Sequence, residues 1–146
     1  MGILFGPVLS SRLGLSLGID ITPSSTCSFD CVYCEAGRTL FKTISYYSEI
    51  TANDVIKALE DYFDISKKTP DYLTFSGTGE PTLNCNIGEI VRCIKKEFDI
   101  PLCLLTNSST LTDIQVIKRI SECDLVMPSL DAVTQSIFEN INRPVS

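Results

Sequence analysis

The sequence predicts an α/β domain in which helices cover a parallel sheet of four strands. Two observations carry this prediction. Short apolar segments alternate four times along the 146-residue chain with segments whose apolar residues recur at the helical period. Strands that are apolar throughout are typical of parallel sheets, because helices cover such sheets. A chain of this length can bury a core of its own, so we predict one domain over residues 1–146.

Each strand–helix unit has its own start and stop signals. Thr51 or Ser48 can cap the first helix, and Thr112 with Asp113 marks the start of the third, because their side-chain oxygens accept hydrogen bonds from the free N–H groups of a first turn. The strands end at polar or turn-forming residues. In chain order, the predicted elements are a strand at Leu15–Ile21, a helix at Thr51–Phe63, a strand at Tyr72–Phe75, a helix at Ile87–Phe98, a strand at Leu102–Leu105, a helix at Ile114–Ile120, a strand at Leu125–Met127 and a helix that begins at Val133.

The loops that leave the four strands predict a functional edge of the sheet. Right-handed crossovers place the carboxyl ends of all four strands on one side, where the ligands of such sheets bind. Loops that enter a strand, such as 122–124, carry ordinary turn residues, whereas every loop that leaves a strand is rich in polar or special residues. These loops are TCSFDCVYCEAG at 26–37, GTGEPT at 77–82, TNSS at 106–109 and SLD at 129–131.

Charge and composition narrow the class of protein. Acidic side chains outnumber basic ones by 18 to 12, which argues against a general affinity for nucleic acid. The pairs Lys67-Lys68 and Lys95-Lys96 lie in or beside amphipathic segments and predict solvated helix faces. The N-terminus lacks the pattern of a signal peptide, and no stretch approaches the roughly 18 apolar residues of a membrane span. Seven cysteines in such a chain predict a cytoplasmic protein with reduced thiols.

The three cysteines of the first loop, Cys27, Cys31 and Cys34, can converge on one metal centre. A structural zinc ion needs four Cys or His ligands, but the chain has no histidine and only Cys85 lies near a second loop of this edge. A disulfide or redox pair is another alternative. A cubane iron–sulfur cluster fits the number best, because each of its four irons takes one thiolate and three cysteines leave one iron open to a substrate.

The spacing Cys27-x3-Cys31-x2-Cys34, with Tyr33 directly before the last cysteine, resembles the signature of the radical S-adenosylmethionine (radical SAM) superfamily. The glycine–glutamate loop after the second strand strengthens this resemblance. The N-terminal FGPVLSSRLGLSLGIDITP is similar to iron–sulfur oxidoreductases related to the wyosine-base synthases of tRNA. The resemblance implies a TIM-like barrel of six strand–helix units, of which four are predicted here. We therefore expect a partial barrel, truncated at the C-terminus before the last strands.

The resemblance also implies a reaction. The three cysteines would hold a 4Fe-4S cluster, and the amino and carboxylate groups of S-adenosylmethionine would chelate its open iron. One electron, from a donor such as ferredoxin or flavodoxin, would cleave S-adenosylmethionine, and the resulting 5′-deoxyadenosyl radical would abstract hydrogen from an unknown substrate. The protein would supply orientation and a protected site. No side chain is assigned a catalytic role of its own.

In the family, the glycine–glutamate loop receives the methionyl amino group of S-adenosylmethionine. The matching residues here are Gly77, Thr78, Gly79 and Glu80, where Thr78 stands in place of a glycine that the family often has. The alternative for this loop is a plain strand-to-helix turn, for which glycines are also suited.

The polar loops after the third and fourth strands match further cofactor contacts of the family. Asn107 and Ser108 would lie near the carboxylate or ribose of S-adenosylmethionine, and Ser129 and Asp131 near the ribose hydroxyls. Tyr33, beside the last cysteine, is assigned to the same cofactor site. The alternatives are a turn with a helix cap at 106–109 and a helix start at Asp131.

Other polar and thiol side chains remain open between two interpretations. Arg38 follows the cysteine loop and either screens the cluster or binds substrate, or else is an exposed surface residue. Cys85 is either structural or a second metal ligand. The other three cysteines are interpreted as small buried hydrophobic residues, and they are Cys93, Cys103 and Cys123.

A second hypothesis is a non-catalytic iron–sulfur or S-adenosylmethionine-binding module that works with a partner chain. The fourth predicted strand has no further strand at its edge, and an open edge favours pairing with a partner or with another copy. The acidic charge and the absence of cysteines before Cys27 argue against tRNA as substrate, although the resemblance to wyosine-base synthases keeps tRNA as a candidate. No membrane partner is expected.

Overall fold

The computed structural model describes residues 2–66 and 68–145. Within them the chain forms a five-stranded sheet, a two-stranded sheet and four α-helices. The strands are β1 (Leu4–Ser10), β2 (Gly14–Ile19), β3 (Thr26–Cys27), β4 (Phe41–Lys42), β5 (Tyr72–Phe75), β6 (Leu102–Thr106) and β7 (Leu125–Pro128). The helices are α1 (Ala52–Ile65), the short 3-10 helix η1 (Pro81–Leu83), α2 (Ile87–Glu97), α3 (Ile114–Ile120) and α4 (Gln135–Asn142).

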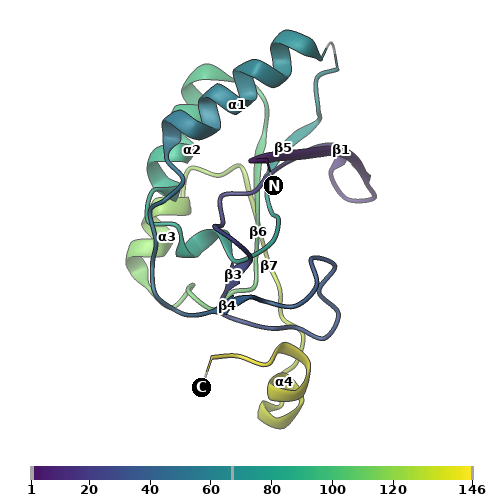
Figure 1. Cartoon of the computed structure of the whole chain (residues 1–146), viewed down its shortest axis with the longest axis vertical. Helices are drawn as coiled ribbons and strands as arrows, with labels where there is room; N and C mark the ends of the chain where they lie inside the picture. Colours follow the sequence, from purple (N-terminus) through teal and green to yellow (C-terminus); the bar gives the residue numbers. More distant parts are fainter. Residues whose placement is uncertain (1, 67, 146) are drawn as a thin grey trace.

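Four strands of the large sheet are parallel, which confirms the predicted α/β class. The strand order is β1-β2-β5-β6-β7, and β2, β5, β6 and β7 pair in parallel with their neighbours. Figure 1 shows α1, α2 and α3 along one side of these strands. Crossover helices on a single face are typical of the wall of a β/α barrel rather than of a doubly wound sheet, which has helices on both faces. The fold is therefore a mostly parallel α/β sheet consistent with part of a barrel.

The sequence did not predict β1, which pairs antiparallel with β2 at the edge of the sheet. Gly6 and Pro7 interrupt its apolar pattern, and the pairing register shifts between Phe5 and Val8. Proline removes a backbone donor, so a strand that contains it is restricted to an edge or an irregular pairing. β1 has both features.

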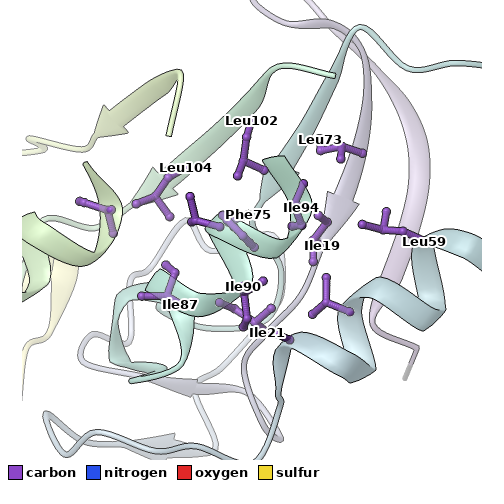
Figure 2. Packing of buried hydrophobic residues seen from close by; sticks show 14 of the residues in the cluster. Ile19, Ile21, Leu59, Leu73, Phe75, Ile87, Ile90, Ile94, Leu102 and Leu104 are labelled. Carbon is purple, nitrogen blue, oxygen red and sulfur yellow. The ribbon is translucent and has the colours of Figure 1, made fainter. Parts of the chain in front are cut away.

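The hydrophobic core lies between the sheet and the three stacked helices, as Figure 2 shows. Alternate strand residues point into this core, since successive side chains of a strand face opposite sides. The opposite face of the sheet carries small and polar side chains, among them Ser16 and Thr74, whose hydroxyls lie 2.7 Å apart. The core residues that Figure 2 labels are Ile19, Ile21, Leu59, Leu73, Phe75, Ile87, Ile90, Ile94, Leu102 and Leu104.

Local polar contacts determine where the elements begin and end. Thr51, rather than Ser48, caps α1 in a reciprocal capping box with Asp54. Asp113 caps α3 by accepting a hydrogen bond from the N–H of Gln115 at 2.8 Å. Both helix starts agree with the sequence signals.

Most predicted boundaries differ from the structure by one or two residues, and two of these differences have a clear physical reason. The first predicted strand ends at Ile19 rather than Ile21, because the carboxylate of Asp20 accepts the N–H of Thr22 at 3.0 Å and turns the chain out of the sheet. The fourth helix begins at Gln135 rather than Val133, which is 92% exposed and has no core to pack against. Figure 1 shows α4 apart from the other helices, beyond the end of the sheet.

Other sequence-based expectations can be compared with the described residues. All seven cysteines are free thiols. Lys68, Lys95 and Lys96 are exposed as predicted, whereas Lys67 lies outside the described residues. Among the residues described, no helix is long and apolar enough to cross a membrane.

We expect Gly18→Ala to destabilise the protein because the ring of Phe5 occupies the space beside Gly18. A Cβ atom added at Gly18 would lie 2.1 Å from Cζ of Phe5. Overpacking of this kind costs about 1–3 kcal/mol in the free energy of unfolding. The measurement is urea-induced unfolding of the two single variants, Gly18→Ala and Phe5→Ala, and of the double variant. We expect the cost of Gly18→Ala to disappear in the Phe5→Ala background; an equal cost in both backgrounds would contradict the placement of β1.

Candidate metal centre

The four loops that leave the parallel strands meet around one cleft of about 180 Å³. Parallel strands have their carboxyl ends side by side, so loops far apart in sequence become neighbours. Most of the predicted site residues line this cleft, and three of them, Thr78, Ser108 and Asp131, do not. The lining residues are Cys27, Cys31, Tyr33, Cys34, Ser76, Gly77, Gly79, Glu80, Leu105, Thr106, Asn107 and Ser129.

The cysteine loop brings its three thiols to the cleft through two successive turns. The N–H of Cys34 donates to the carbonyl of Cys31 at 3.2 Å, and the N–H of Gly37 donates to the carbonyl of Cys34 at 3.0 Å. Gly37 has a φ of 84°, a conformation that favours glycine. Cys27 and Cys31 are half-buried, whereas Cys34 is exposed.

The thiol of Cys27 has the most enclosed position of the three. Burial raises its pKa above the ordinary value, and the N–H of Phe29, at 3.5 Å from the sulfur, opposes this effect. The charges of Glu80 and Cys31 raise the pKa further. A metal that binds here would therefore displace a proton from Cys27, because thiolates rather than thiols are metal ligands.

The donor set of the cleft fits a cluster with three cysteine ligands. In a cubane each iron takes its own thiolate, so three cysteines on one short loop can bind three of the four irons. Cys85 is exposed and lies outside the cleft, so it does not complete a four-cysteine set there. In the described parts of the chain, no three His, Cys, Asp or Glu side chains are close enough to hold a single metal ion.

The carboxylate of Glu80 joins the loop after β5 to the loop after β6. One of its oxygens accepts hydrogen bonds from the N–H and hydroxyl of Thr82, at 3.2 and 2.6 Å, and from the hydroxyl of Thr106 at 2.7 Å. The other accepts the N–H of Asn107 at 2.7 Å. Burial raises the pKa of Glu80 while these four hydrogen bonds lower it, and the residue is only 1% exposed. Glu80 thus fixes the relative position of the two loops.

The glycines of this loop are required by close neighbours. A Cβ atom on Gly79 would lie 1.9 Å from the carbonyl oxygen of Thr26. Gly77 has a φ of 139°, and a Cβ atom there would lie 2.3 Å from Cγ of Asp20. Only glycine accommodates such an approach. The loop after β5 therefore packs directly against the start of the cysteine loop.

Thr78 faces away from the thiols. Its N–H and its hydroxyl each lie 2.9 Å from the same carboxylate oxygen of Asp20. It lines a separate cleft of about 600 Å³ together with Asp20, Ser25 and Arg38. Asp20 was not among the predicted site residues, although an aspartate at the end of a strand, before Thr22-Pro23, is a turn signal that could have identified it.

The loop after β6 reaches the cysteines through Asn107. Its side-chain N–H group lies 3.4 Å from the sulfur of Cys27 and 2.9 Å from the hydroxyl of Ser28. The hydroxyl of Ser108 donates to the carbonyl of Ser129 at 2.8 Å, which ties the loop after β6 to the loop after β7. Asn107 and Ser129 line the cleft, whereas the hydroxyl of Ser108 binds the neighbouring loop instead.

Asp131 forms a polar cluster with Tyr33 and Asn142 at the margin of the cleft. The Tyr33 hydroxyl donates to the carboxylate of Asp131, and the side-chain amide of Asn142 donates to the same carboxylate oxygen at 2.6 Å. Burial and this hydrogen bond raise the pKa of the Tyr33 phenol. The alternative prediction, that Asp131 starts the fourth helix, is wrong, because α4 begins at Gln135.

Two further residues support the site and were missed from the sequence. Tyr47 donates its hydroxyl to the backbone carbonyl of Glu80 at 3.1 Å, and burial followed by the charge of Glu80 raises the pKa of this phenol. Asn142 is 1% exposed. Tyr47 lies between β4 and α1, outside the four polar loop motifs, and Asn142 is the last residue of α4. No local pattern singles either out.

Arg38 is a surface residue of the cysteine loop. It forms an ion pair with Asp30 at 3.0 Å, and its side chain is 84% exposed. This exposure agrees with the surface interpretation of Arg38 rather than with a role in the cleft.

Comparisons with known proteins agree with this geometry. The sequence model of the Radical SAM superfamily matches residues 21–146. UPF0026 protein MJ1312 of Methanocaldococcus jannaschii is 43% identical over 145 residues, which cover 99% of this chain and 45% of that protein. UPF0026 protein slr1464 of Synechocystis is 39% identical over 144 residues, which cover 98% of this chain and 53% of that protein.

A third relative is named as a GTPase rather than as a UPF0026 protein. GTPase Obg of Brachyspira hyodysenteriae is 41% identical over 144 residues, which cover 97% of this chain but 21% of that protein. The chain contains no Gly-x4-Gly-Lys-Ser/Thr loop of the kind that cradles nucleotide phosphates. The chain spans about half the length of the UPF0026 relatives.

We expect Glu80→Gln to destabilise the metal-free protein by about 1–3 kcal/mol, the range for a buried polar group left without its partner. Whichever way the amide is oriented, its NH₂ group would face a backbone N–H, that of Asn107 or that of Thr82. The measurement is the free energy of unfolding in urea. Glu60→Gln, at an exposed position of α1, is the matched control. Equal stability of the two variants would contradict the role of Glu80 in fixing the loop after β5 against the loop after β6.

Proposed function

The chain belongs to the radical SAM superfamily, and on that premise we propose that it binds a 4Fe-4S cluster through Cys27, Cys31 and Cys34 and uses S-adenosylmethionine as cofactor. The observation that carries the proposal is the three-thiol loop, which opens into a cleft formed by all four loops at the carboxyl edge of the sheet. Electron-transfer clusters have a thiolate on every iron, so a three-thiolate set favours a cluster with one iron open to a ligand.

The chain's own residues would bind and orient the reacting groups. The three cysteines provide thiolates, and the glycine–glutamate loop, with Gly79 packed on Thr26, presents its backbone to the cleft. Asn107 and Ser129 add polar groups to the same wall. A reduced 4Fe-4S cluster held by these cysteines would provide one-electron chemistry, the reductive cleavage of S-adenosylmethionine to methionine and a 5′-deoxyadenosyl radical that can abstract hydrogen.

The reaction also needs partners. We propose a one-electron donor of the ferredoxin or flavodoxin class, a reducing compartment such as the cytoplasm, and a substrate that is a small molecule or a macromolecule, including tRNA. The chain covers about half of its UPF0026 relatives, so residues that select the substrate in those proteins need not lie within the part compared.

A second candidate is an iron–sulfur or S-adenosylmethionine-binding module that acts with a partner chain. Exposed apolar side chains around α4 favour it, since apolar surface of this kind is often covered in an assembly. These are Leu130, Val133 and Ile137, which are 80%, 92% and 49% exposed. Turnover by the purified chain alone would exclude this candidate.

We expect Cys34→Ala to abolish assembly of the 4Fe-4S cluster, because one iron would lose its only protein ligand. The measurement is iron and sulfide content after anaerobic reconstitution, together with the EPR spectrum of the reduced protein. Cys85→Ala is the matched control, since Cys85 is exposed and lies outside the cleft. We expect about four irons per chain in the control and in the unmodified protein. Zinc in place of iron after anaerobic purification would contradict the proposal.

We expect the reconstituted protein to form 5′-deoxyadenosine and methionine in equal amounts when it is reduced in the presence of S-adenosylmethionine. Liquid chromatography of the quenched reaction measures both products. If the protein holds a full cluster and forms no 5′-deoxyadenosine, the catalytic proposal is contradicted. The second candidate, a binding module that acts with a partner chain, would then be favoured.

A further inference from the structure

Two asparagines from different elements approach two of the thiols of the cleft. The side-chain nitrogen of Asn107, at the end of β6, lies 3.4 Å from the sulfur of Cys27. The side-chain nitrogen of Asn142, at the end of α4, lies 3.4 Å from the sulfur of Cys31. Both distances are within the range of N–H···S hydrogen bonds, and Cys34 has no such donor among the described residues. The site therefore has two hydrogen-bonded sulfurs and one exposed sulfur.

The orientation of the Asn142 amide is determined by its neighbours. Its nitrogen faces the sulfur of Cys31, the hydroxyl of Tyr33 at 3.4 Å and the carboxylate of Asp131 at 2.6 Å. Its oxygen is buried and has no hydrogen-bond donor. A flipped amide would set its oxygen against the Asp131 carboxylate, so the donor side must face the cysteine. The unpartnered oxygen is costly for a buried group, which indicates that the N–H groups are the part of this side chain that the site uses.

Backbone contacts hold Asn142 against the cysteine loop. The N–H of Asp30 donates to the carbonyl of Asn142 at 3.0 Å, and the N–H of Val32 donates to the carbonyl of Ile141 at 2.9 Å. The rings of Phe29 and Phe138 meet edge to face with 5.3 Å between their centroids. The last turn of α4 is thus fixed to the segment on either side of Cys31.

Asn107 is also held by its own contacts. Its backbone N–H is bound by the buried carboxylate of Glu80, and its side-chain oxygen accepts the N–H of Ser109 at 3.0 Å. The side-chain N–H groups of Asn107 are then free to donate to Cys27 and Ser28.

We propose that Asn107 and Asn142 are positioning residues that donate N–H groups to the cluster-ligating sulfurs of Cys27 and Cys31 and thereby raise the reduction potential of the cluster. The proposal rests on the cluster binding proposed above. A hydrogen bond to a thiolate stabilises the more negative, reduced cluster more than the oxidised one, so donors to sulfur make reduction easier. Cys34 has no such donor among the described residues, and its side chain is exposed.

The test compares three leucine variants of the full chain after anaerobic reconstitution without S-adenosylmethionine. Asn142→Leu and Asn107→Leu keep the side-chain size but remove the N–H groups, and Asn140→Leu, at an exposed position of α4, is the matched control. Spectroelectrochemical titration measures the midpoint potential. We expect each of the first two variants to lower the ratio of reduced to oxidised cluster about tenfold at a given potential, which is a shift of about 59 mV for a one-electron couple. We expect no shift for Asn140→Leu.

A second measurement does not depend on the stability of the variants. The unmodified protein is labelled with ¹⁵N on asparagine side chains, and pulsed EPR of the reduced cluster reports nitrogen within hydrogen-bond distance of it. We expect ¹⁵N couplings that persist in the Asn140→Leu variant.

The outcomes separate this inference from the proposed function. Loaded clusters with unchanged potentials in both variants, or no ¹⁵N coupling in the unmodified protein, would overturn the role of the asparagines and leave cluster binding intact. Failure of the unmodified protein to hold any cluster would overturn both. If only the Asn142→Leu variant fails to bind a cluster, the inference is tested by the midpoint potential of the Asn107→Leu variant and by the ¹⁵N couplings of the unmodified protein.

Discussion

The carboxylate of Glu80 lies buried beneath the cleft with four hydrogen-bond donors around it, contributed by Thr82, Thr106 and Asn107. Burying a carboxylate is costly unless hydrogen bonds compensate it, so the donors and the acceptor fix one another's positions. Two loops that are adjacent only because their strands are parallel become one rigid wall. Asn107 extends that wall to the sulfur of Cys27. The geometry at the first cysteine therefore depends on a contact made one loop away.

The cysteine loop has little regular structure of its own and depends on its neighbours. β3 and β4 form a short parallel pair at its two ends, Gly79 packs against Thr26, and the end of α4 binds the backbone around Cys31. Cys27 and Cys31 are held between these elements, and Cys34 is left exposed. This asymmetry suits a site at which a ligand must approach from the open side.

The sequence predicts much of the fold and part of the site. The parallel strands could be predicted because their apolar runs and polar exits repeat, and the convergence of Cys27, Gly79 and Asn107 follows from the common direction of the strands. β1 could not be predicted, because Gly6-Pro7 interrupts the strand pattern and its pairing with β2 shifts in register. Asn142 could not either, since its contact with Cys31 spans 111 residues and no local pattern encodes it. The orientation of Thr78 depends on the single carboxylate of Asp20, which sequence spacing does not reveal.

In the proposed function, three cysteines hold a four-iron cluster and leave one iron open to S-adenosylmethionine. Mössbauer spectroscopy of the full chain, reconstituted with ⁵⁷Fe, tests it most directly, because each iron site gives its own signal. We expect that adding S-adenosylmethionine changes about a quarter of the iron signal, that of one iron in four. A cluster whose spectrum is unchanged by S-adenosylmethionine would contradict it.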